Sequence, residues 1–103
     1  MNRAQLRGSW THSFEEDQGD VLVYRPSYSF AFPPARGRDT LEFGEGGELT
    51  EQRPGPDDRP RAMAGRWKAL GMNRYQLSGA ANVPSRVIEI IEHTPEVLRI
   101  RRV

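Results

Sequence analysis

The chain has 103 residues, the size of one ordinary domain, so we expect a single domain over residues 1–103. Its 15 basic side chains nearly cancel its 14 acidic ones, and this balance argues against a nucleic-acid partner. The absence of cysteine excludes disulfide and thiolate chemistry, and the absence of a long apolar run predicts a cytoplasmic protein without a membrane partner.

Alternation of apolar and polar residues with a period of two predicts a first strand over residues 6–14. The apolar face of this strand carries Leu6, Gly8, Trp10, His12 and Phe14. A polar turn over residues 16–20 follows, and residues 21–25 form a second predicted strand. Pro26 ends this strand, because proline cannot donate a hydrogen bond to a neighbouring strand.

Residues 26–38 form an irregular segment between prolines that contains the aromatic residues Tyr28, Phe30 and Phe32. So much apolar surface is unusual in a solvated loop. We expect the segment either to fold over the end of the core as a lid or to present a contact surface. The lid is the favoured interpretation.

Six further strands are predicted, separated by turns rich in glycine, proline and polar residues. They cover residues 39–43, 48–52, 62–70, 74–78, 86–93 and 97–102. Residues 86–93 could also form a helix, but their many β-branched side chains favour a strand. Eight short strands joined in sequence predict an all-β fold, an eight-stranded antiparallel up-and-down barrel. The interior of such a barrel has room for side chains or for one small ligand.

The pattern Gly-x-Trp occurs twice, as Gly8-Ser9-Trp10 and as Gly65-Arg66-Trp67, and these are the only two tryptophans. Glycine close to a large ring suits a strand that bends sharply while the ring fills a core. We therefore expect both tryptophans to have a structural role inside the barrel.

A Gly-x-Trp on the first strand together with an arginine-rich last strand resembles the pattern of the lipocalins and the wider calycin group. More narrowly, residues 8–17, 24–26 and 33–38 look like a family of short, uncharacterised bacterial lipocalin-like proteins. The resemblance implies a barrel in which Trp10 plugs one end. It also implies that Arg99, Arg101 or Arg102 packs across the Trp10 ring in a cation–π contact. Because the family has no assigned activity, the resemblance implies a fold without a function.

Polar residues near the other end of the predicted barrel suggest a binding site. Arginine is well suited to carboxylate and phosphate groups, which it can hold through two parallel hydrogen bonds. We expect a small organic or acidic ligand at the open end, without a cofactor, bound by His12, Tyr24, Arg25, Arg36 and Arg38. The alternative is that these arginines pair with Glu15, Glu16 or Asp17 and hold the aromatic segment in place.

Two other classes of function stay open. A small barrel enzyme of the isomerase or cyclase type could use His12 with Tyr24 or Glu15 as acid and base. A protein-interaction domain would instead present the segment from Tyr28 to Phe32 as its contact patch.

No metal site is predicted from the sequence. His12, His93 and Glu89 would make a plausible set of ligands only if the fold brought all three together, and their spacing matches no metal motif. The sequence also leaves open the oligomeric state, and whether the barrel interior is hollow or filled.

Overall fold

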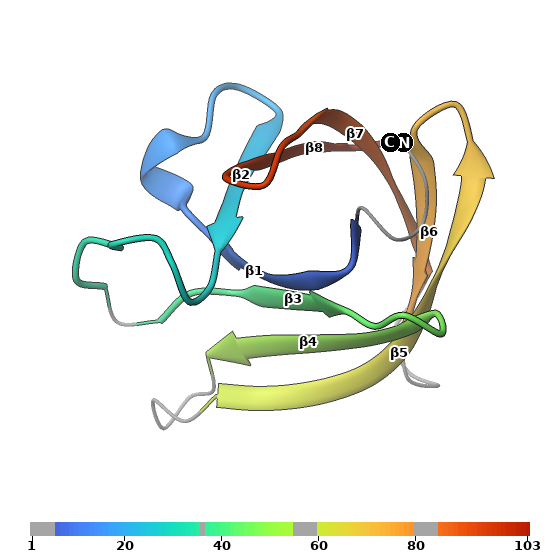
Figure 1. Ribbon diagram of the computed structural model, residues 1–103, viewed down its shortest axis with the longest axis horizontal. Helices are drawn as coiled ribbons and strands as arrows, with labels where there is room; N and C mark the ends of the chain where they lie inside the picture. Colours follow the sequence, from blue (N-terminus) through green and yellow to red (C-terminus); the bar gives the residue numbers. More distant parts are fainter. Residues whose placement is uncertain (1–5, 36, 55–59, 80–84) are drawn as a thin grey trace.

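Eight antiparallel strands close into a barrel in the computed structural model, which describes residues 6–35, 37–54, 60–79 and 85–103 (Figure 1). A short 3₁₀ helix, η1 (Phe14–Glu16), lies between the first two strands. The predicted all-β barrel is confirmed, and residues 86–93 form a strand rather than a helix. The strands are β1 (Gly8–His12), β2 (Val21–Pro26), β3 (Thr40–Phe43), β4 (Glu48–Pro54), β5 (Pro60–Gly71), β6 (Arg74–Ser78), β7 (Arg86–His93) and β8 (Leu98–Arg102).

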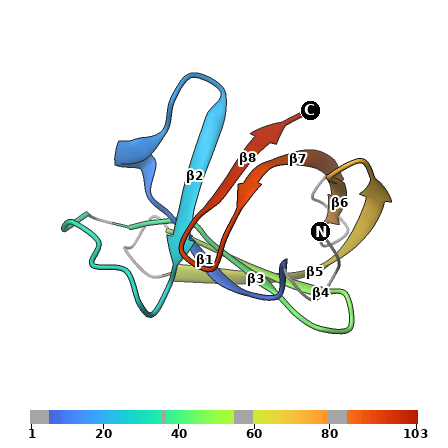
Figure 2. The ribbon, with the colours of Figure 1, turned by 45° about the horizontal axis from the view of Figure 1, so that its top comes forward.

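The order of strands around the barrel departs from a simple up-and-down meander in one place. Strands β3 to β8 follow one another, but β1 lies between β2 and β3, and β2 pairs with β8. Figures 1 and 2 show the blue β1 beside the green β3 and the cyan β2 beside the red β8. The connection from β2 to β3, described over residues 27–35 and 37–39, therefore crosses β1, which a tight hairpin turn could not do.

The described part of this crossing segment runs outside the barrel wall, and not over the barrel end (Figure 1). The Ser27 Oγ lies 2.8 Å from the Ser9 Oγ and 2.7 Å from the Thr11 Oγ1, on the outer face of β1. The Thr11 Oγ1 in turn lies 3.1 Å from the Thr40 Oγ1 of β3. The expected lid over the core is thus wrong, because a segment that crosses β1 must follow its polar outer face.

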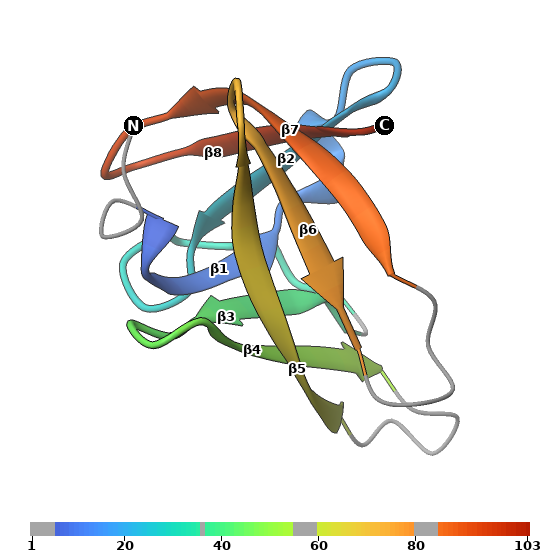
Figure 3. The same ribbon diagram turned by 90° about the vertical axis from the view of Figure 1, so that its right-hand side faces the viewer.

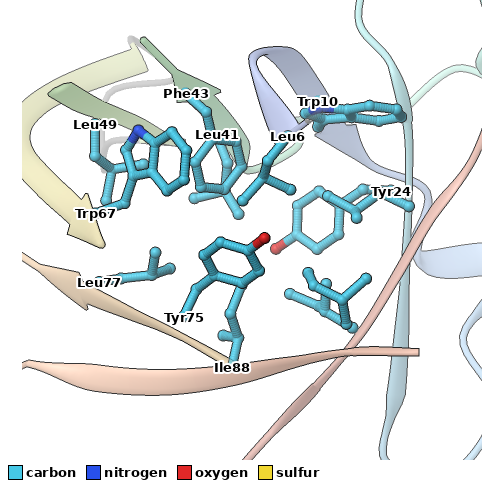
Figure 4. Packing of buried hydrophobic residues seen from close by; sticks show 13 residues of the cluster. Leu6, Trp10, Tyr24, Leu41, Phe43, Leu49, Trp67, Tyr75, Leu77 and Ile88 are labelled. Carbon is cyan, nitrogen blue, oxygen red and sulfur yellow. The ribbon is translucent and has the colours of Figure 1, made fainter. Parts of the chain in front are cut away.

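Side chains on the inner faces of the strands fill the barrel, as the period of two predicts (Figure 4). Trp67 takes part in this packing, with its ring centroid 5.6 Å from that of Phe43 and 5.7 Å from that of Tyr75. Its indole Nε1–H donates a hydrogen bond of 3.1 Å to the Gly44 carbonyl oxygen. The polar atom of this large ring is therefore satisfied within the core.

The two Gly-x-Trp copies both turn their tryptophan inward, since Trp10 is 5% and Trp67 is 2% exposed. The two glycines are needed for different reasons. Gly8 has a φ of +130°, which residues with a Cβ rarely adopt. Gly65 lies on β5, which runs along β6 (Figure 3), and a Cβ there would lie 2.2 Å from the Ser78 carbonyl oxygen. Local strain at Gly8 and close strand approach at Gly65 therefore explain the repeated motif.

Candidate functional site

One end of the barrel, called the mouth here, is where β1, β4, β6 and β8 finish and the other four strands begin. A cavity at this end has a floor of aliphatic side chains that includes Leu22, Leu77, Ile88 and Ile100. Its volume is about 20 Å³, which is room for about one water molecule. The barrel interior is therefore filled rather than hollow, and a ligand at this end has to bind at the rim. The polar residues that surround the cavity include Tyr24, Asp39, Glu51, Arg53, Arg86 and Arg102.

A buried ion pair lies in the wall of the mouth. Glu51 is only 3% exposed, because it lies on the inner face of β4 two residues after the core residue Leu49. Arg86, at the start of β7, donates hydrogen bonds from its two terminal nitrogens to the two carboxylate oxygens of Glu51. The Arg53 Nη2 lies farther away, 3.7 Å from the Glu51 Oε1. A carboxylate so deeply buried depends on its cationic partner.

Among the described residues that line the cavity, positive charges outnumber negative ones. Three guanidinium groups, on Arg53, Arg86 and Arg102, stand against the two carboxylates of Asp39 and Glu51. Arg102 makes no ion pair or hydrogen bond with any residue that the structure describes. Since Arg102 shares the inner face of β8 with the buried Leu98 and Ile100, its unpaired charge lies at the rim of the cavity.

Tyr24 lies below this charged rim. Of the four predicted ligand-binding residues that the structure describes, it is the one that lines the cavity. The side chain is 5% exposed, and its hydroxyl group faces that of Tyr75 inside the barrel (Figure 4). Burial, with a smaller contribution from Asp39, raises the pKa of Tyr24 to about 12. The phenol is therefore neutral at physiological pH and can donate a hydrogen bond.

His12 lies beside Tyr24 but does not line the cavity. Its ring stacks on the Tyr24 ring with centroids 4.9 Å apart, and its Nε2 lies 2.9 Å and 3.1 Å from the two carboxylate oxygens of Asp17. The Asp17 Oδ1 also accepts a hydrogen bond of 2.9 Å from the Val23 amide. The bonds from His12 and Val23 to Asp17 thus hold the residue that follows η1 against β1 and β2. The enzyme hypothesis expected Tyr24 or Glu15 as the partner of His12. His12 stacks on Tyr24 but forms its hydrogen bonds with Asp17, and catalysis by His12 stays a hypothesis.

Arg25 is held on the outside of the barrel by η1. Its Nε and Nη2 donate to the two carboxylate oxygens of Glu16 at 2.9 Å and 2.7 Å, and its guanidinium lies 5.0 Å from the ring centroid of Phe30. This pairing is the alternative that the sequence left open, in which the arginines pin the aromatic segment. Arg25 is therefore separated from the mouth cavity.

Arg38 makes a similar set of contacts. Its two terminal nitrogens donate to the Glu15 carboxylate at 2.8 Å and 2.6 Å, and its guanidinium lies between the rings of Phe14, at 4.6 Å, and Phe32, at 5.2 Å. The Glu15 carboxylate raises the pKa of Arg38, which stays charged. The remaining predicted ligand-binding residue, Arg36, lies outside the described residues.

The Arg25–Glu16 pair makes a specific contribution to acid stability. Hydrogen bonds from Arg25 lower the pKa of Glu16 from 4.5 to about 2. The unfolded chain therefore takes up the proton first as the pH falls, and the stability from this pair, present above about pH 5, is lost between there and about pH 2. Because the pair is partly exposed, we expect its contribution to be below about 1 kcal/mol.

Urea unfolding between about pH 6 and pH 3 tests this expectation. The free energy of unfolding of Glu16→Gln should fall less steeply with acid than that of the parent chain. All other carboxylates are common to both proteins. If the free energies of unfolding of the two proteins fell equally with acid, this part of the acid dependence would not come from Glu16.

The aromatic segment presents little of its apolar surface. Phe30 and Phe32 contact each other with centroids 4.8 Å apart and are half-buried below the two arginines. Tyr28, in contrast, is 90% exposed. A contact patch made of the whole segment, as the interaction hypothesis requires, is therefore reduced to a single exposed ring.

At the opposite end of the barrel, Trp10 plugs the interior together with Leu6, which is fully buried. The ring that contacts Trp10 is that of His93, with centroids 5.5 Å apart and planes at 70°. The resemblance implied an arginine here, but Arg99 alternates with buried residues of β8 and so faces outward. There its Nε lies 3.1 Å from a carboxylate oxygen of Glu92.

The described residues contain no group of three His, Cys, Asp or Glu side chains that could hold a metal ion. His12 and His93 lie toward opposite ends of the barrel, and Glu89 pairs with Arg101 and Arg74 on the outer surface. The fold therefore does not bring this candidate set together.

Sequence reasoning missed the charged rim residues of the mouth. One signal was available for Glu51, which shares the parity of Leu49 on a strand whose inner face is apolar. Arg102 similarly shares the parity of Leu98 and Ile100. A charged residue on the inner face of a barrel strand marks either an ion pair or a binding site.

No protein-family model, curated protein or solved structure matches this chain. Its membership in a bacterial lipocalin-like family therefore stays a prediction from the sequence. In the described part of the chain, no helix has the length and apolar character needed to cross a membrane.

Proposed function

We propose that the protein is a small-molecule-binding barrel of the lipocalin-like type, located in the cytoplasm, that takes a small monocarboxylic acid at its mouth. The observation that carries the proposal is the guanidinium of Arg102, which has no partner among the described residues, beside a cavity whose described lining carries one excess positive charge. Guanidinium groups bind carboxylates in a planar, two-bond geometry. A singly charged acid would neutralise the rim.

The size of the cavity limits what can bind. A volume of about 20 Å³ admits no organic molecule, so the carboxylate head would bind at the rim, to Arg102 and Arg53. The Tyr24 hydroxyl, kept protonated by burial, could donate to a water molecule below the carboxylate. The rest of the acid would lie outside the barrel, which favours small ligands over the long hydrophobic ones that hollow barrels enclose.

The proposal predicts thermal stabilisation by acids and not by their amides. Acetate, butyrate and benzoate, added at constant ionic strength, should raise the melting temperature, whereas acetamide, butyramide and benzamide should not. A ligand at a hundredfold excess over its dissociation constant stabilises the folded state by about 2.7 kcal/mol, which is a rise of roughly 10–20 °C for a domain of this size. Differential scanning fluorimetry measures both series.

Arg102→Gln should weaken binding about 10- to 100-fold, because a hydrogen-bonded charge is lost, while leaving the melting temperature of the free protein nearly unchanged. Arg101→Gln is the matched control, since Arg101 faces outward and pairs with Glu89. Equal stabilisation of both variants by benzoate, or no stabilisation of the parent protein by any of the acids, would contradict the proposal.

A further inference from the structure

A groove of about 420 Å³ lies at the plugged end of the barrel, opposite the mouth. It is formed where the segment leading into β1 meets the end of β7 and the turn that follows. Its volume is within the range of known small-molecule sites, roughly 300–1,000 Å³. The residues that line it are Arg7, Trp10, His93, Thr94 and Pro95.

Trp10, which lines this groove, carries a buried donor. The residue is 5% exposed, yet its indole Nε1–H makes no hydrogen bond with any described residue. The other tryptophan differs, because the Trp67 Nε1–H donates to the Gly44 carbonyl oxygen. Buried polar groups in proteins nearly always have partners, so an exception on a residue that lines a groove is consistent with a missing ligand atom that accepts a hydrogen bond.

His93 adds a second polar group to the same groove. It contacts the Trp10 ring edge to face, and the structure gives it no hydrogen bond among the described residues. Burial lowers the pKa of His93, so the imidazole is neutral at pH 7 and offers one donor and one acceptor. The Thr94 Oγ1 already accepts hydrogen bonds from the Glu96 and Val97 amides, both at 3.1 Å, and its own proton is available.

The described residues give this groove aromatic walls and leave no unpaired charge among its lining side chains. Arg7, the one cation that lines it in the described chain, forms an ion pair of 2.7 Å with Glu45. A charged ligand would therefore find no free counter-charge among the described residues, whereas a flat ring could lie against Trp10, His93 and Pro95. We propose that this groove is a second binding site, which takes an uncharged planar heteroaromatic molecule whose ring nitrogen or carbonyl oxygen accepts a hydrogen bond from the Trp10 indole or from His93.

The indole N–H signals of the two tryptophans provide a direct test by ¹H–¹⁵N NMR, with Trp67→Phe used for their assignment. Titration with quinoxaline should move the Trp10 signal saturably and leave the Trp67 signal in place. Naphthalene has the same shape without an acceptor, and we expect it to bind about tenfold more weakly, the loss that corresponds to one hydrogen bond. His93→Phe, which keeps a ring against Trp10, should also weaken quinoxaline binding.

Two controls separate this site from the mouth. Arg102→Gln should bind quinoxaline like the parent protein, and the outward-facing Arg74→Gln should do the same. The proposal is overturned if the Trp10 signal does not move, if both indole signals move together, or if naphthalene and quinoxaline bind equally. Benzoate, as an anion, should leave the Trp10 signal unchanged, so failure at this groove is distinguishable from failure at the mouth.

Discussion

Arg86→Met is expected to lower the free energy of unfolding by about 3–5 kcal/mol at neutral pH, the usual cost of removing one partner from a buried ion pair. Glu51 is 3% exposed and has no water-facing alternative. Arg53 cannot replace Arg86 unless it moves closer, because its Nη2 lies 3.7 Å from the nearest Glu51 oxygen, which is too long for a hydrogen bond. Urea unfolding at pH 7, followed by tryptophan fluorescence, measures the difference.

The double variant Glu51→Leu/Arg86→Met is the control for this prediction. It removes both charges and fills the same space with apolar side chains, so it should recover most of the lost stability. If the single variant costs less than about 1 kcal/mol, the pair behaves as an exposed ion pair, and its description as a buried wall of the mouth is wrong.

Gly65→Ala is expected to destabilise the barrel by about 2–3 kcal/mol. The added Cβ would lie 2.2 Å from the Ser78 carbonyl oxygen and 3.1 Å from the Gly79 Cα. Both are backbone atoms, so β5 and the end of β6 would have to separate and disturb the pairing that buries Trp67. Thermal and urea unfolding followed by circular dichroism would report the loss.

Ala64→Ser, one residue away on the exposed face of β5, is the matched control and should change stability by less than about 0.5 kcal/mol. Gly8→Ala provides a contrast, because a Cβ there meets its nearest atom only at 3.9 Å and its cost comes from the backbone φ alone. If Gly65→Ala is as stable as the parent protein, close strand approach does not explain the second Gly-x-Trp.

Local pattern was enough to predict the strands but not their order. Alternation along β1 and β8, and the β-branched residues of β7, are visible in the sequence and decide secondary structure without any knowledge of neighbours. Which strand pairs with β1 depends on contacts between distant residues. The irregular segment over residues 26–38 is compatible with both a lid and a crossing, and only the pairing of β1 with β3 distinguishes them.

The candidate site was predicted less well, for a related reason. The structure places Tyr24 at the cavity, although the unbroken apolar run of residues 21–24 does not show which of these side chains face inward. Arg25 and Arg38 have acidic neighbours in η1, and whether they pair with these or face a ligand depends on where η1 packs. Arg86 lies on β7, whose adjacent aliphatic residues leave its parity ambiguous, so its inward direction was not evident.

The position of β1 between β2 and β3 has a consequence for how the chain folds. Strands β4 to β7 pair only with their neighbours in sequence, whereas β1 has to find β3 and β2 has to find β8, so that Val21 comes to face Arg101. Contacts between residues so far apart in the chain carry the largest loop-closure entropy and form slowly. The N-terminal hairpin, which brings Trp10 and Tyr24, is therefore the part of the barrel expected to join last, and both ends of the barrel acquire their defining aromatic residue in that single step.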